Sequence, residues 1–238
     1  IYTLSLHDAL PIYELLLMFF DVKSFTELFP LVLSALGMTA KIALLSLIGT
    51  LLLSTAIAVV RYYRVPIFTQ FFGVFVTVFR ATPLVVELFI IFFALPAVIP
   101  PLKAMTPFQA TVLSLILNTS AFMAESFRAA LDSVDRGQIE ACYSMGMTRR
   151  QAMVRAILPQ AFVVAVPSIG NHFIGIIKGT ALGFTVGLAD VMGTAKMEAA
   201  LNLRFFEAYL CVTIVYVALV LTVEFFLRRI ERRMQNLY

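Results

Sequence analysis

The sequence predicts an all-α polytopic membrane protein with about five transmembrane helices. The chain has 238 residues, of which 61% are hydrophobic and 13% are charged, and its mean hydropathy is +0.95. Soluble domains are nearer half apolar and a quarter charged. Several apolar runs reach the roughly 20 residues that a helix needs to cross a bilayer. The short alternating segments typical of a membrane β-barrel are not evident in the sequence.

Each expected span corresponds to one apolar run. In the first run, residues 42–60 carry no charge and could cross the membrane alone. The second run contains Arg80, Pro83 and Glu87, and Pro167 lies in the fourth. Because proline lacks an N–H donor and clashes with the preceding turn, Pro83 and Pro167 predict kinks. In order, the runs cover residues 28–60, 66–99, 108–127, 159–188 and 205–227.

Basic residues flank these runs unevenly, which predicts an orientation. Five spans place the two chain ends on opposite sides, and cytoplasmic loops carry the excess of Lys and Arg. Four basic residues fall on one side: Lys23, Lys103, Lys196 and Arg204. Eleven fall on the other: Arg61, Arg64, Arg128, Arg136, Arg149, Arg150, Arg155, Arg228, Arg229, Arg232 and Arg233. We therefore expect the amino terminus outside and the carboxyl terminus in the cytoplasm. Because the basic residues lie beside apolar spans and set this orientation, the net charge of +4 does not predict a nucleic-acid partner.

The ends of the chain are assigned separately from the transmembrane domain, residues 31–230. Residues 1–12 lack an initiator Met and the basic region of a signal peptide. They resemble translated sequencing-adapter DNA, and we expect a non-native leader. Residues 13–30 should form an extracytoplasmic segment, either an interfacial helix or a frayed end. Residues 231–238 should be a cytoplasmic tail.

A polar segment, about residues 129–158, interrupts the apolar pattern between the third and fourth runs. Residues 140–145 are compatible with a helix, and Gly146 should break it, since Gly costs about 1 kcal/mol relative to Ala in a helix interior. Residues 147–157 predict a second short amphipathic helix that Pro159 ends. Two short helices meeting at a glycine would form a compact knob for a groove on a partner, although a plain long loop is the alternative.

This segment resembles the EAA loop of ABC importer permeases, which couples them to an ATPase. The matching residues are Glu140, Ala141, Cys142, Gly146, Leu158 and Pro159. Cys142 replaces the second Ala of the pattern, and Ala156 occupies its usual Ile position. The sequence around residues 79–84, 124–128, 158–161, 167, 170–171 and 177–180 is similar, in order, to the polar amino-acid branch of that family (histidine, glutamine, arginine, cystine). Residues 178–184 and 189–192 look closest to cystine-type permeases.

The resemblance, which covers about residues 35–230, implies a transport subunit that is not itself an enzyme. It implies alternating access for a polar amino acid across a bacterial cytoplasmic (inner) membrane. A second permease subunit, the same or a paralogous chain, would pair with this one. A cytoplasmic ATPase dimer would dock at residues 140–146 and bind ATP and Mg²⁺, and an extracytoplasmic solute-binding protein would deliver cargo. The sequence has no phosphate-binding Gly-x-x-x-x-Gly-Lys-Ser/Thr loop, and we expect no cofactor or metal in this chain.

Charged residues inside the apolar runs are candidates for the translocation path. Insertion scales assign such charges a cost of about 2.5–3.5 kcal/mol at a span centre. We expect Glu87, Glu125 and Lys178 to line or brace the path, with Lys178 the best candidate for a structural ion pair or a pathway residue. Lys41 and Arg80 could instead reach an interface with their charged ends.

The candidate path set is completed by polar residues and prolines near these charges. Asn118 could contact substrate or hydrogen-bond a neighbouring helix, and the second is favoured. The set comprises Arg80, Thr82, Pro83, Glu87, Asn118, Glu125, Asn171, Lys178 and Thr180. A separate group, Gly175, Gly179, Gly183 and Gly187, recurs every four residues. This small-residue pattern predicts close helix packing, with flexibility near a broken helix end as the alternative.

Two other function classes fit the composition less well. An ion-coupled secondary transporter of small polar solutes would also carry intramembrane charges, but such carriers often contain internal repeats, and none is evident. That class also leaves the polar segment unexplained. A membrane-embedded enzyme would need a clustered catalytic set within its spans, which this sequence does not offer.

Overall fold

The computed structural model describes residues 20–235, and the regular structure within that range is helical. Residues 1–12, the first part of the expected segment 13–30 (residues 13–19) and the end of the expected tail lie outside the described residues. The rest of that segment, residues 20–30, includes the start of helix α2 (Val22–Ser34). Four helical segments are long and apolar enough to cross a membrane: Val22–Tyr62, Pro107–Asp132, Arg149–Val186 and Phe205–Met234. A fifth span results if the bent pair Phe68–Ala81 and Leu84–Val98 counts as one. The prediction of about five spans is confirmed.

The helices follow one another with short connections. In chain order they are α2 (Val22–Ser34), α3 (Leu36–Tyr62), α4 (Phe68–Ala81), α5 (Leu84–Phe89), the π-helix η1 (Ile90–Ala94), α6 (Leu95–Val98), the 3₁₀-helix η2 (Pro100–Ala104), α7 (Pro107–Asp132), α8 (Arg136–Ser144), α9 (Arg149–Ala152), the π-helix η3 (Met153–Ile157), α10 (Leu158–Thr180), the 3₁₀-helix η4 (Ala181–Val186), α11 (Val191–Asn202) and α12 (Phe205–Gln235).

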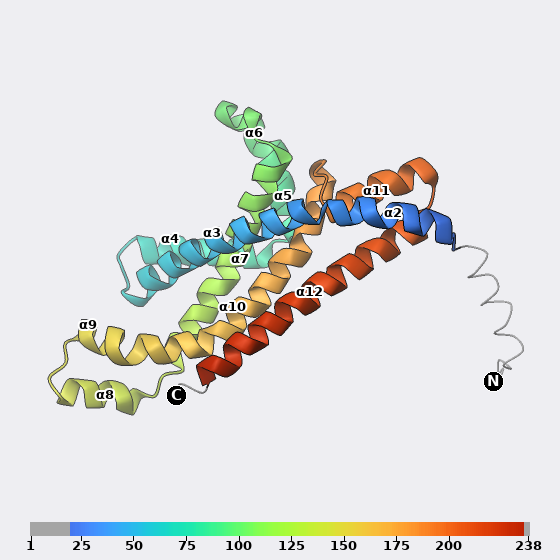
Figure 1. Cartoon of the computed structure of the whole chain (residues 1–238). Coiled ribbons are helices and arrows are strands. Elements are labelled where there is room, and N and C mark those ends of the chain that lie inside the picture. Colours follow the sequence, from blue (N-terminus) through green and yellow to red (C-terminus); the bar gives the residue numbers. More distant parts are fainter. Residues whose placement is uncertain (1–19, 236–238) are drawn as a thin grey trace, which may run out of the picture.

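The body is an elongated bundle in which α3, α7, α10 and α12 are the long members (Figure 1). The short helices α8 and α9 lie at one end of it, and α2 and α11 lie at the other. Apolar side chains join these elements. Ile42 of α3, Leu115 of α7 and Ile176 of α10 belong to one buried cluster, and Val32 of α2 packs with residues of α11 and α12 in another.

The second apolar run is sharply bent rather than straight. Thr82 and Pro83 are both extended, with ψ of 137° at each, and the helices on either side meet at 110°. Pro83 cannot donate the hydrogen bond that would continue α4. The predicted kink at this position is confirmed and is larger than a kink within one helix. At Pro167, by contrast, α10 continues without interruption.

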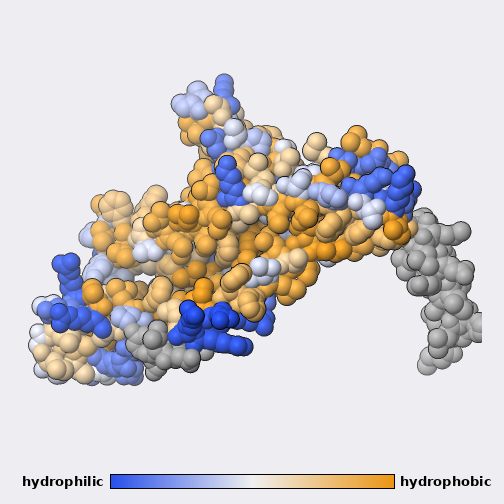
Figure 2. Space-filling model, viewed as in Figure 1, coloured by the Kyte–Doolittle hydropathy of each residue, from blue (hydrophilic) through white to orange (hydrophobic). Residues whose placement is uncertain are grey.

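Hydrophobic residues cover the sides of the bundle, and hydrophilic residues gather at its ends (Figure 2). On α12, for example, the exposed side chains include Val217, Leu221 and Phe225. In water a continuous apolar surface of this kind would favour association or aggregation. Its position between two polar ends is that expected for a bundle surrounded by lipid.

Candidate functional site

The polar segment between α7 and α10 folds into a compact unit, here called the α8–α9 knob (residues 135–152). Its first helix begins at Asp135, whose carboxylate accepts a 2.8 Å hydrogen bond from the Gly137 N–H. Its end is a Schellman motif: the Met147 N–H donates to the Cys142 carbonyl at 3.0 Å, and the Gly146 N–H donates to the Tyr143 carbonyl at 2.9 Å. This motif needs a left-handed residue, and Gly146 has φ of 77°. The predicted break at Gly146 is confirmed.

The second half of the knob begins with a capping box. The Gln151 N–H donates to the Thr148 hydroxyl, and the Thr148 N–H donates to the Gln151 side chain at 2.8 Å. The expectation that Pro159 ends this helix is wrong. The chain passes from α9 through η3 directly into α10, and Pro159 lies in the first turn of α10. Proline is compatible with the first turn of an α-helix, and the turn before it, η3, has π rather than α geometry.

The base of the knob is fixed to the bundle by packing and by polar contacts. Met153 and Ile157 of η3 are buried in a cluster with Ala130 of α7 and Ala161 of α10. Ile139 of α8 packs against the same cluster. Two further contacts tie the knob down: the Gln160 amide donates to the Gln138 side chain at 2.5 Å, and the Arg149 guanidinium lies 5.6 Å from the ring centres of both Tyr62 and Tyr63 at the end of α3.

The outer surface of the knob has no cover from any described residue. Met145 is 79% exposed and Tyr143 is 47% exposed, while Glu140 is exposed and makes no ion pair within the described part of the chain. Cys142 is half-buried. Aromatic and Met side chains beside a charge are typical of protein–protein contact surfaces. Leu158 and Pro159 lie instead at the start of α10, beneath the knob. Four of the six motif residues therefore belong to the knob, and the other two belong to the helix that supports it.

A second polar group lies at the α4–α5 bend. The Asn118 amide donates to the Glu87 carboxylate at 3.1 Å and to the Phe79 carbonyl at 3.2 Å. Glu87 is 5% exposed, and its other oxygen, Oε2, is buried without a hydrogen-bond partner. The favoured prediction for Asn118, a hydrogen bond to a neighbouring helix, is confirmed. Thr82 lies beside this group at the C-cap of α4, where its hydroxyl donates to the Val78 carbonyl.

The three charges expected to act together are separated in the structure. Glu125 pairs with Arg61 of α3 and, at 2.9 Å, with Arg128 of its own helix. Lys178 is exposed in a groove beside Tyr216 and makes no ion pair with any described residue. No described residue therefore supports the ion-pair alternative for Lys178, and its role as a pathway residue stays a prediction. Position in an apolar run does not determine which face of the helix a residue occupies, and Lys178 faces outward.

The remaining candidate path residues are dispersed. Arg80 and Lys41 are exposed and stack over Phe122 and Phe108, at 5.7 and 5.3 Å from the ring centres. Asn171 is exposed, whereas Thr180 is buried.

Thr180 belongs to a buried polar group that the sequence did not single out. Its hydroxyl lies 3.2 Å from the Tyr216 hydroxyl, which donates to the Asp190 carboxylate at 3.4 Å. The other Asp190 oxygen caps α11 by accepting from the Gly193 N–H at 2.9 Å. Burial raises the pKa of Asp190, which lies between two candidate spans. An Asp directly before a helix is a capping signal that can be seen in the sequence, but nothing in the sequence indicates that Asp190 pairs with Tyr216 of α12.

Among the described residues no group of three His, Cys, Asp or Glu could hold a metal ion.

The four regularly spaced glycines do not form one helix stripe. Only Gly175 and Gly179 lie in α10; Gly183 lies in η4, and Gly187 ends η4 with φ of 87°. A Cβ on Gly179 would lie 2.7 Å from the Leu115 Cδ2 atom of α7, so this position does require close packing. Gly175 has no atom within 4 Å of such a Cβ. The prediction of close packing is therefore confirmed at Gly179 and at Gly183, where an added Cβ would lie 2.5 Å from the Leu188 Cδ2 atom, but not at Gly175 or Gly187. The stripe does not continue along one helix because α10 changes to 3₁₀ geometry after Thr180.

Comparisons with known proteins agree with this arrangement. Residues 50–236 match the family model described as "Binding-protein-dependent transport system inner membrane component". The probable amino-acid ABC transporter permease protein PatM of Vibrio harveyi is 45% identical over 83% of this chain and 88% of its own length. The probable amino-acid permease protein YxeN of Bacillus subtilis is 40% identical over 92% of this chain and 97% of its own.

A solved structure has the same fold. It is described as "Crystal structure of an amino acid ABC transporter with histidines", is 33% identical in sequence, and superposes with a TM-score of 0.83 over 90% of this chain and 99% of that chain. Together with the helical spans and the α8–α9 knob, these matches confirm the resemblance to ABC importer permeases. The chain belongs to the family of binding-protein-dependent transport system inner membrane components.

Proposed function

We propose that this chain imports a polar amino acid by alternating access, powered by a separate ATPase dimer that docks on the α8–α9 knob. A second permease subunit, the same or a paralogous chain, completes the path, and a solute-binding protein delivers the cargo from outside. ATP and Mg²⁺ bind to the ATPase. An amino-acid cargo is supported by the names of PatM and YxeN and by the solved amino acid ABC transporter whose fold this chain shares.

The knob rests on a base that is packed against the bundle, and its outer surface is exposed. This combination is the observation that supports docking of a partner there. Its hydrogen bonds are satisfied by caps at both helices, so it needs no partner in order to fold. Met145 and Tyr143 are nevertheless exposed beside Glu140. An exposed apolar surface that the fold does not require is best explained by a partner protein.

The continuity of the helix explains how docking could drive transport. Arg149–Val186 forms one 38-residue helical segment, from the knob to the far end of the fourth span. Since Met153 and Ile157 of η3 are packed against side chains of α7 and α10, a displacement of the knob would be transmitted to α10. We assign the knob and the carboxyl terminus to the cytoplasm, because the basic residues are concentrated on that side of the expected spans.

Glu87 is the residue we assign to cargo preference. Its carboxylate is buried next to the α4–α5 bend with one oxygen unpartnered, a costly arrangement inside a membrane. A cargo amino group reaching this oxygen would offset that cost. Relatives named as L-cystine transport system permeases, such as TcyL of Bacillus subtilis at 36% identity, are consistent with a cargo that carries amino groups.

The test is uptake by proteoliposomes that contain this chain, its ATPase and its binding protein, with a panel of labelled amino acids. Wild-type protein should accumulate at least one amino acid only when ATP is present. Glu140→Arg should lower uptake by about tenfold or more, because a wrong charge at a docking surface costs several kcal/mol. Glu231→Arg, on α12 outside the knob, is the control and should retain uptake. Unchanged, ATP-coupled uptake by Glu140→Arg would remove the docking role.

A further inference from the structure

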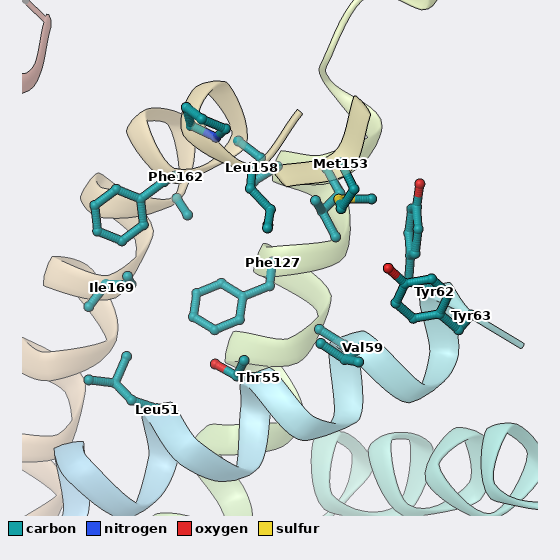
Figure 3. Close-up of a pocket in the computed structure, with 16 residues that line it drawn as sticks. Leu51, Thr55, Val59, Tyr62, Tyr63, Phe127, Met153, Leu158, Phe162 and Ile169 are labelled. Atoms are coloured by element: carbon teal, nitrogen blue, oxygen red, sulfur yellow. The ribbon is translucent and has the colours of Figure 1, made fainter. Parts of the chain in front are cut away.

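An apolar groove of about 580 Å³ lies between α3, α7 and the start of α10, directly beside the base of the knob (Figure 3). Leu51 and Val59 of α3, Phe127 of α7, and Phe162 and Ile169 of α10 line it. Thr55 points into it from α3. The groove has the size of a small-molecule site, but its walls contain almost no polar group to orient a polar ligand.

The groove opens on an exposed apolar surface of the candidate spans. Val59 is 48% exposed and Phe162 is 55% exposed, and both belong to candidate membrane spans. Leu52, next to the groove on α3, is also exposed. An acyl chain from the surrounding bilayer could enter without crossing any polar barrier, since the groove is continuous with that apolar surface.

One end of the groove carries positive charge without a partner. Tyr62 and Tyr63 form part of the lining, and the Arg149 guanidinium rests on both rings. Arg149 makes neither an ion pair nor a side-chain hydrogen bond with another described residue, so its N–H donors remain available. Arg150 and Arg155 follow on the same helical segment, and within the described chain neither pairs with a carboxylate. Arginine is suited to phosphate because its planar donors can bind two oxygens at once.

The same charge argues against a second copy of the chain as the occupant. Two copies in one membrane have the same orientation, so a contact through this face would bring two sets of unpaired arginines to the same depth. Like charges at such a contact repel. A phosphate group would instead neutralise them.

We propose that this groove binds one anionic phospholipid, with an acyl chain between Phe127 and Phe162 and the headgroup phosphate at Arg149. The bound lipid would fill the space beneath the knob, where η3 joins α10. This lipid site is distinct from the cargo path and from the outer surface of the knob.

The test uses p-benzoylphenylalanine in place of Thr55, a photoreactive side chain that would project into the groove. The control places it at Ala56, which is exposed on α3 but does not line the groove. The full chain, with the subunits that copurify, is placed in nanodiscs of equal parts phosphatidylglycerol and phosphatidylcholine. Irradiation followed by mass spectrometry then identifies the adducts.

Adducts at position 55 should be enriched in phosphatidylglycerol by about fivefold, the scale of one cationic residue near an anionic lipid. Adducts at position 56 should follow the equal composition of the bilayer. Arg149→Gln should abolish the enrichment, whereas Arg232→Gln, near the carboxyl end of α12 and not in the lining of the groove, should not. Equal lipid composition at positions 55 and 56 would overturn the proposal. Adducts of position 55 with a polypeptide would also overturn it and would identify the groove as a protein interface.

Discussion

At the scale of the residue, Gly146 determines the shape of the knob. The Schellman motif that ends α8 needs a positive φ, and Gly146 supplies φ of 77°. A Cβ at this position would meet no atom within 4 Å, so a side chain is opposed only by the backbone conformation. The sequence contained this information, because a glycine between two helix-compatible stretches is a strong C-cap signal. Local chemistry of this kind is the part of the site that can be predicted best.

Gly146→Ala should weaken the knob without unfolding the protein. An L-residue in the left-handed region costs about 1–2 kcal/mol, which corresponds to roughly 5- to 30-fold more frequent opening. Hydrogen exchange of the amides in residues 146–147 should accelerate by that factor, because their hydrogen bonds form the motif. Gly37→Ala is the matched control: Gly37 lies in α3 with open space around it, and the change should leave exchange in the knob unaltered. Equal exchange rates in Gly146→Ala and wild type would contradict the assigned role.

Individual residues also show where sequence reasoning stops. The apolar surroundings of Lys178 predict either an ion pair or a pathway residue; the residue lies on an exposed face and makes no ion pair with any described residue. Asp190 has no site role in the sequence pattern, yet it is fully buried against Tyr216. Both outcomes depend on how α10, α11 and α12 are rotated about their axes. In a helix that is apolar all round, the pattern gives no direction to that rotation.

At the scale of the element, the spans were predictable and their interruptions only partly so. Apolar length marked every candidate span, and Pro83 marked the bend. The 110° angle at that bend could not be predicted, because it depends on where α5 packs rather than on proline alone. Pro159 predicts a helix end but lies in the first turn of α10. A proline permits either outcome, and the buried side chains of η3 decide between them.

The contact between α7 and α10 gives a prediction that separates packing from helix propensity. Gly179→Val should destabilise the protein by about 1–3 kcal/mol, the usual effect of overpacking a filled contact, because its Cβ would lie 2.7 Å from Leu115 Cδ2. Gly175→Val, one turn earlier on the same helix, meets open space and should have little effect. Thermal unfolding in detergent compares the two variants. If both lower the midpoint equally, the close contact at Gly179 is not the reason for the glycine.

At the scale of the whole molecule, the chain has two polar ends joined by apolar spans. Figure 1 shows the α8–α9 knob at one end and α2 with α11 at the other. The knob is continuous with α10, and Arg149 joins it to the end of α3. A force applied at the knob therefore reaches two spans directly. This arrangement suits the proposed transfer of energy from a docked partner, and the chain belongs to the family of binding-protein-dependent transport system inner membrane components.

The central claim is that the outer surface of the knob contacts the ATPase. It is tested most directly by photocrosslinking in the assembled complex, with p-benzoylphenylalanine in place of Met145. Met145 is 79% exposed at the tip of the knob, and Met197 of α11, 63% exposed at the other end of the bundle, is the matched control. We expect an adduct with the ATPase subunit from position 145 and none from position 197. An absence of ATPase adducts at position 145, or equal adducts at both positions, would contradict the account.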